Sequence, residues 1–109
     1  MQGIEHEYRD EVLLIRFAKE ELKLQDAERI IEIVFDLEES WSIQKVILDM
    51  AGVTYTNSTV ISAIGRLADA KDLRIVSMHA KVQAIMDTMG LLPFLEFSPS
   101  VDEALAGFE

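Results

Sequence analysis

The chain has 109 residues, half of them hydrophobic, which is enough for one domain with a buried core. It has no cysteine, which excludes disulfides, thiolate nucleophiles and Cys-ligated metals. The formal net charge is −10, which disfavours nucleic acid and anionic lipid as partners and favours a protein with a basic face.

The first part of the chain predicts a β-hairpin followed by a helix. Residues 4–8 and the more apolar residues 11–17 are predicted strands, with a turn at residues 8–11 between them. Asp26 is predicted to cap the next helix, whose apolar face is Ala27, Ile30, Ile31, Val34, Phe35 and Leu37 or Glu38. The opposite face is acidic, and we expect it to be exposed to solvent and to have no catalytic or binding role. We expect Trp41, the sole tryptophan, to cover the end of this helix.

The centre of the chain changes from a strand pattern to a helix pattern within about ten residues. Residues 46–48 are a short apolar run, rich in β-branched side chains, that predicts a buried strand. A helix is predicted from Ser58 onwards, because apolar residues then recur at helical spacing: Val60, Ile61, Ile64 and Leu67. Asn57 and Ser58 therefore lie at a helix N-terminus, where side-chain oxygens cap free N–H groups and an anion is favoured.

The last part of the chain continues the alternation of strands and helices. Residues 73–78 and 94–97 are predicted strands, with a helix over residues 81–89 that ends at Gly90. A final helix is predicted from Pro99, with Ser98 or Ser100 as its cap. The order predicts a single α/β domain over residues 1–109, with an N-terminal hairpin and parallel strands joined by right-handed crossover helices. Whether the helices cover one face of the sheet or both stays open.

The side chains give no pattern typical of an enzyme, a metal site or a cofactor site. His6 and His79 lack a second ligand at metal-binding spacing, and no glycine-flanked elbow surrounds Ser58. The sequence therefore predicts a protein that is not an enzyme and needs no cofactor. There is no signal-peptide pattern and no apolar run long enough to cross a bilayer, so we expect a cytoplasmic protein without membrane insertion.

Three segments, in the right order, resemble the STAS domain family, whose founding members are bacterial anti-sigma factor antagonists. The first is residues 46–58, Val-Ile-Leu-Asp-Met-Ala-Gly-Val-Thr-Tyr-Thr-Asn-Ser, which is similar to the family's apolar strand and phosphorylation motif. The second is the strand over residues 73–78. The third is residues 84–94, which resemble the family's helix ending in Gly-Leu before the last strand. The resemblance implies a STAS-like mixed sheet.

The resemblance also implies a function, partner switching, for the loop and the helix at Ser58. By motif position Ser58 matches the phosphoacceptor serine, and the contact face would be Tyr55, Thr56, Asn57, Ser58, Thr59, Val60 and Ser62. The implied partners are an anti-sigma factor that is also a serine kinase, and a phosphatase that restores binding. A phosphate would add about −1.5 to −2 charges to this face.

Two other functions stay open. Asn57 stands where the family usually has Asp, and Thr59-Val60 replaces a Ser-Gly or Ala-Gly pair. These differences favour a STAS interaction or scaffold subunit that is not phosphorylated, in a signalling or transport assembly. The helix N-terminus also suits a small anionic ligand or nucleotide, against which the net charge of −10 acts. Self-association is possible and the sequence does not decide it.

Overall fold

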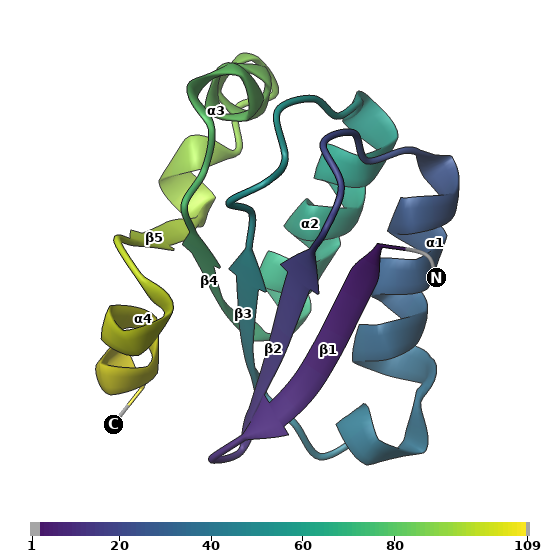
Figure 1. Ribbon diagram of the computed structural model, residues 1–109, viewed down its shortest axis with the longest axis vertical. Coiled ribbons are helices and arrows are strands. Elements are labelled where there is room, and N and C mark those ends of the chain that lie inside the picture. The colour runs from purple at the N-terminus through teal and green to yellow at the C-terminus, as the bar shows by residue number, and fades with distance from the viewer. Residues whose placement is uncertain (1–2, 109) are drawn as a thin grey trace.

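A five-stranded sheet with the strand order β1-β2-β3-β4-β5 runs through the computed structural model, which describes residues 3–108 (Figure 1). The strands are β1 Ile4–Arg9, β2 Val12–Phe17, β3 Lys45–Asp49, β4 Asp72–Val76 and β5 Glu96–Ser98. β1 and β2 pair antiparallel, and each later neighbour pairs parallel. The predicted α/β fold, with an N-terminal hairpin and parallel strands joined by crossover helices, is confirmed.

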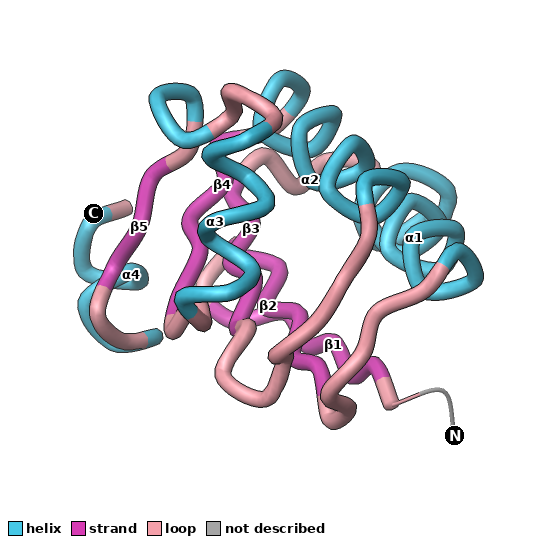
Figure 2. Tube along the Cα trace, turned by 90° about the horizontal axis from the view of Figure 1, so that it is seen from above, coloured by secondary structure: helices cyan, strands magenta, loops and turns pink. Residues whose placement is uncertain are grey.

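Helices cover both faces of the sheet. The main ones are α1 Leu24–Ile31, α2 Ser58–Ala70, α3 Ala80–Thr88 and α4 Val101–Gly107. Shorter helical turns are η1 Glu32–Asp36, which continues α1 in π-helical form, η2 Glu38–Ser40 and η3 Leu92–Phe94. α1 and α2 lie side by side on one face, α4 packs on the other face over β3 to β5, and α3 crosses one end (Figures 1 and 2).

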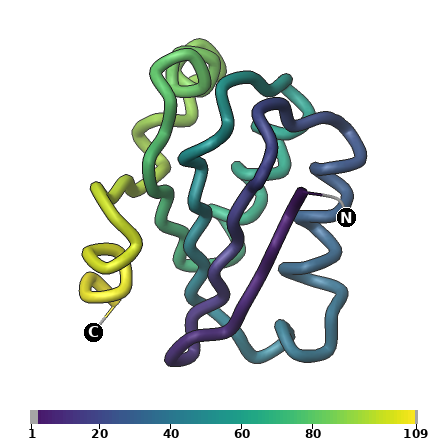
Figure 3. The backbone as a smooth tube through the Cα atoms, in the orientation of Figure 1, coloured from purple at the N-terminus to yellow at the C-terminus, as the bar shows by residue number. Residues whose placement is uncertain are grey.

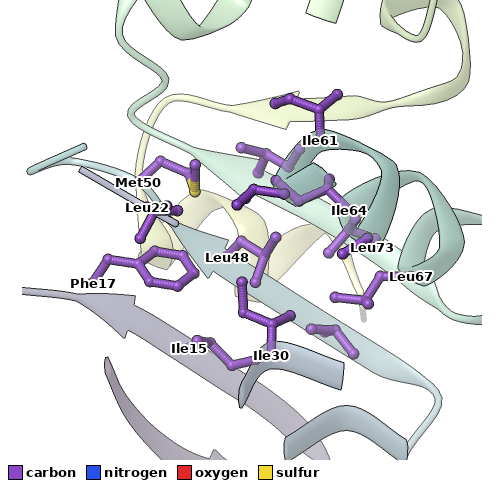
Figure 4. Packing of buried hydrophobic residues seen from close by; sticks show 14 of the residues in the cluster. Ile15, Phe17, Leu22, Ile30, Leu48, Met50, Ile61, Ile64, Leu67 and Leu73 are labelled. Atoms are coloured by element: carbon purple, nitrogen blue, oxygen red, sulfur yellow. The ribbon is translucent and has the colours of Figure 1, made fainter. Parts of the chain in front are cut away.

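The main hydrophobic core lies between the sheet and the pair of helices α1 and α2. Figure 4 shows Ile15 and Leu48 of the sheet packed against Ile30 of α1 and Ile64 of α2. A smaller cluster on the other face joins Val12, Leu14, Ile47 and Val76 to Ala104 of α4. Residues 12–15 of β2 and residues 46–48 of β3 are buried on both faces of the sheet, which explains why these stretches lack a polar-apolar alternation, whereas Arg16 of β2 is exposed.

The hairpin turn lies where the sequence predicts it. Asp10 and Glu11 connect β1 to β2, and both have positive φ, 52° and 68°. Two consecutive residues with positive φ form a turn whose twist matches that of the flanking strands. Ser77, directly after β4, also has positive φ (61°).

Four predictions differ from the structure. The strand predicted at residues 73–78 is β4 and ends at Val76, because the positive φ of Ser77 interrupts the extended backbone. Lys23, not Asp26, is the N-cap residue of α1; Asp26 caps the helix from its first turn, where its buried carboxylate accepts from the backbone N–H of Lys23. Trp41 is 67% exposed, so it does not cover the end of the helix. The predicted strand at residues 94–97 begins at Glu96, because the chain first makes the turn η3, which contains Pro93.

No helix within residues 3–108 is both long and apolar enough to cross a membrane.

Candidate functional site

The candidate site is the N-terminus of α2 with the loop that leads into it from β3. Asn57 is the N-cap, and its side-chain oxygen Oδ1 accepts a hydrogen bond from the backbone N–H of Val60 at 3.0 Å. Its carbonyl oxygen accepts the first helical bond, from the N–H of Ile61 at 3.1 Å. Ser58 is therefore the first helical residue, and its side chain is exposed. Because Asn57 supplies the capping oxygen, the Ser58 hydroxyl is not needed to begin the helix.

The loop after β2 holds the loop after β3 in place by backbone hydrogen bonds. The carbonyl oxygen of Glu20 accepts from the N–H groups of Thr54 and Tyr55, at 2.8 and 3.1 Å. In return, the N–H of the buried Leu22 donates to the carbonyl of Tyr55 at 3.1 Å. The two loops run side by side at the same end of the sheet (Figure 3). This pairing fixes the backbone three residues before Ser58.

The seven predicted contact residues fall into two groups. Tyr55, which is 57% exposed, lies at the surface with Ser58, Thr59 and Ser62, and Asn57 is half-buried. Thr56 and Val60 are buried, so their side chains support the site from inside and are not available for contact with a partner.

The hydroxyl of Thr56 is a polar group in the interior. Its Oγ1 has no hydrogen-bond partner among residues 3–108. An unpaired buried hydroxyl lowers the stability of the folded state, so we expect Thr56 to reduce the free energy of unfolding.

A groove between α1 and α2 begins beside Ser58 and was not predicted. Its volume is about 570 Å³, and its walls are Leu24, Ala27, Glu28, Ile31, Glu32, Asp36, Thr59, Ser62, Ala63 and Arg66. Leu24 is 56% exposed, although it begins the apolar stripe that Ala27 and Ile31 continue. The i, i+3, i+7 spacing of these three residues is the sequence pattern from which an apolar face extending beyond the core could have been predicted.

Both histidines lie away from Ser58 in sequence and make other contacts. His79 is the N-cap of α3, where its Nδ1 accepts from the N–H of Lys81 at 3.1 Å. The ring of His6 packs edge-on against Tyr8 with 6.0 Å between centroids. Within residues 3–108 no group of three histidine, cysteine or acidic residues is arranged to hold a metal ion.

Comparison with known proteins gives one family and a set of similar structures. The family model described as STAS domain matches residues 4–104. No curated protein matches the chain significantly. An anti-sigma-factor antagonist (STAS) domain protein from Planctomyces limnophilus is 18% identical, with a TM-score of 0.81 over 100% of this chain and 99% of that one.

Two further structures share the fold. The unphosphorylated form of the anti-sigma factor antagonist SpoIIAA is 16% identical, with a TM-score of 0.78, 96% of this chain covered and 95% of that one. A sulfate transporter family protein from Wolinella succinogenes is 16% identical, with a TM-score of 0.71, 92% of this chain covered and 86% of that one. At these identities the likeness concerns the fold, and the family rests on the match that spans nearly the whole sequence. The chain belongs to the STAS domain family.

Proposed function

We propose that the protein is an anti-sigma factor antagonist-like module that switches partners through phosphorylation of Ser58. The observation that carries the proposal is the position of Ser58: it is exposed at the first residue of α2, while Asn57 provides the cap. The unphosphorylated module binds a kinase-type anti-sigma factor in the cytoplasm. The kinase modifies Ser58, the complex dissociates, and a phosphatase restores binding.

The proposed switch needs a phosphate that leaves the fold intact and disturbs the contact surface. At a helix N-terminus a phosphate is stabilised by free N–H groups and by the helix dipole, so the domain tolerates it. In a complex the added charge of about −1.5 to −2 must be desolvated next to Tyr55, Thr59 and Ser62. A differential binding free energy of a few kcal/mol is enough to change the partner that is bound.

Similar structures support the proposal at the level of the family. SpoIIAA has been solved in its unphosphorylated form and, from Bacillus, in its phosphorylated form. That protein shares the fold of this chain at 15–16% identity. Phosphorylation and kinase binding are carried over to this chain as part of the proposal.

The test compares two serine variants in binding to a kinase-type anti-sigma factor from the same cells. Ser58→Asp is expected to weaken binding more than about tenfold in isothermal titration calorimetry, with an unchanged circular dichroism spectrum. Ser42→Asp is the control, because Ser42 is exposed at a distance in sequence from the site. Equal affinities for the two variants would contradict the switch.

A second candidate function is a STAS interaction subunit that is not phosphorylated. It is favoured by Asn57 in place of the family's usual Asp, and by the likeness to a sulfate transporter family protein. Peptide mass mapping of protein from its native cells separates the two functions. A phosphate on Ser58 in part of the molecules supports the switch, and unmodified Ser58 in every growth condition supports the second function.

A further inference from the structure

The groove between α1 and α2 is built from one stripe of each helix. On the α1 side the lining residues follow the spacing of a single helix face, and on the α2 side they recur from Thr59 to Arg66 in the same way. The buried lining residues are small: they are Ala27 of α1 and Ala63 of α2, and they form the floor of the groove. Larger apolar side chains, Leu24 and Ile31, form one wall. The α-helical part of this stripe, from Leu24 to Ile31, is roughly 10 Å long at 1.5 Å per residue, which is about two helical turns, and η1 extends it to Asp36.

The charges along the groove have one predominant sign. Glu28, Glu32 and Asp36 lie on the α1 wall, and Arg66 on the α2 wall is the one cation among the lining residues. Glu32 is ion-paired with Arg29. Within residues 3–108 no cation forms an ion pair with Glu28 or Asp36, and both are exposed. These two carboxylates are therefore available to a partner.

We propose that this groove binds a basic amphipathic helix of the partner protein. The apolar side of that helix packs on Leu24 and Ile31 over the alanine floor, and its Lys or Arg side chains face Glu28 and Asp36. A helix laid in a groove between two helices uses the same ridge-and-groove packing that holds α1 against α2. The inference rests on the proposed function in one respect, namely that the protein acts by binding a partner.

The negative charge of the protein and of the groove disfavours other ligands in the groove. A second copy of this chain carries the same net charge of −10 and the same acidic wall, so its approach is repelled. An anionic membrane surface or a nucleic acid is repelled for the same reason. A basic helix gains both from the burial of Leu24 and from its pairing with the acidic wall.

The experiment uses the whole unphosphorylated chain and a model peptide as the probe. The peptide has roughly four helical turns of Leu and Lys, with Leu on one face, and a second peptide carries Glu in place of every Lys. We expect the Lys peptide to shift the NMR amide signals of the groove-lining residues and the Glu peptide to leave them unchanged. Shifts spread over the whole acidic surface, or no shifts at all, would overturn the inference.

Two pairs of variants separate the groove from general electrostatics. The double variant Glu28→Lys with Asp36→Lys is expected to weaken binding of the Lys peptide more than about tenfold. The control, Asp87→Lys with Asp102→Lys, makes the same change in net charge at exposed positions of α3 and α4. Leu24→Ser is expected to weaken binding, whereas Phe94→Ser, also at an exposed apolar position, is not. Equal losses in the matched variants would show that charge or apolar content alone explains binding.

The peptide titration tests the groove without testing phosphorylation of Ser58. A failed peptide titration leaves the comparison of Ser58→Asp with Ser42→Asp to be decided separately. An unchanged affinity of Ser58→Asp for the anti-sigma factor leaves the groove to be judged on the peptide alone.

Discussion

The ammonium group of Lys19 lies 2.8 Å from Oδ1 of Asp26, whose side chain is 1% exposed. The other oxygen of the same carboxylate accepts from the backbone N–H of Lys23 at 2.7 Å. Lys19 belongs to the loop after β2 and Asp26 to the first turn of α1. One buried carboxylate thus joins the start of α1 to the loop that holds the Ser58 segment.

Replacing Asp26 is expected to destabilise the protein. Asp26→Asn keeps the shape of the side chain but removes the charge that Lys19 and the helix N-terminus stabilise, at a cost of about 1–3 kcal/mol in the free energy of unfolding. Urea denaturation measures the difference. Asp36→Asn, at an exposed position, is the control and is expected to cost less than about 0.5 kcal/mol. Similar losses for both variants would show that pairing the buried Asp26 carboxylate with Lys19 does not contribute to stability.

The cap of α2 can be separated from the proposed phosphoacceptor. Asn57→Ala removes the oxygen that accepts from Val60 and is expected to cost about 1 kcal/mol of stability. Ser58→Ala removes a hydroxyl outside the cap and is expected to cost less than about 0.5 kcal/mol. Thermal denaturation of the two variants provides the measurement. A larger loss for Ser58→Ala than for Asn57→Ala would mean that the serine holds the helix.

Thr56 offers a stabilising substitution beneath the site. Thr56→Val keeps the side-chain shape and removes the buried, unpaired Oγ1, so stability is expected to stay equal or to rise by up to about 1 kcal/mol. Chemical denaturation measures the change, with Thr54→Val, at a half-buried position, as the comparison. A loss of more than about 1 kcal/mol in Thr56→Val would indicate that the hydroxyl has a bonding role in solution.

Besides the apolar packing of α4, two cations of the sheet contact Phe108, the residue that follows this helix. The guanidinium of Arg74 lies 4.6 Å from the centre of the Phe108 ring, and Nζ of Lys45 donates to the carbonyl of Phe108 at 3.3 Å. Phe108→Ala is expected to cost about 1–3 kcal/mol in the free energy of unfolding. Phe94→Ala, at a position 75% exposed, is the control with little expected loss. Limited proteolysis should also release α4 sooner in Phe108→Ala.

We expect the free energy of unfolding to fall at high pH because of the raised pKa of Tyr8. Burial, and to a smaller extent the nearby carboxylate of Glu39, raise the pKa of Tyr8 above its usual value of about 10. The folded-state pKa of Tyr8 lies above its unfolded-state pKa. The contribution of the neutral Tyr8 side chain to the free energy of unfolding is therefore complete at a pH below the unfolded-state pKa. It is lost as the pH rises through the folded-state pKa.

The tyrosinate absorbance of a Tyr55→Phe variant measures this titration, since Tyr8 is then the sole tyrosine. The midpoint is expected to be higher in the folded protein than in urea, and Glu39→Gln should lower it only in part, since burial is the larger cause. Identical midpoints in the folded and unfolded protein would contradict the prediction.

Much of the fold follows from local sequence patterns. The apolar runs predict strands at residues 11–17 and a buried strand at residues 46–48, and the structure has β2 and β3 there with their apolar side chains buried. Whether one face of the sheet or both are covered did not follow from these runs. The change to helical spacing at Ser58 gives the start of α2, with Asn57 as its cap, because capping depends on neighbouring residues alone. The stop at Gly90 follows in the same way, since its φ of 73° favours glycine.

Features that depend on contacts between distant segments could not be predicted. Asp26 resembles a cap in sequence, but its buried position depends on Lys19, which another segment supplies. Trp41 was expected to cover a helix, but it follows the turn η2 and its side chain is 67% exposed. The groove requires α1 and α2 to lie side by side, which no pattern within either helix specifies.

The carbonyl oxygen of Glu20 bonds the N–H groups of two successive residues of the opposite loop. An insertion or deletion between Lys19 and Lys23 would therefore shift the backbone of Tyr55 as well. Divergence of the first loop is thus constrained by the second, and an evolutionary change of binding specificity at Ser58 is expected to require paired substitutions in both. Natural sequences of this fold should show correlated variation between residues 19–22 and residues 54–55.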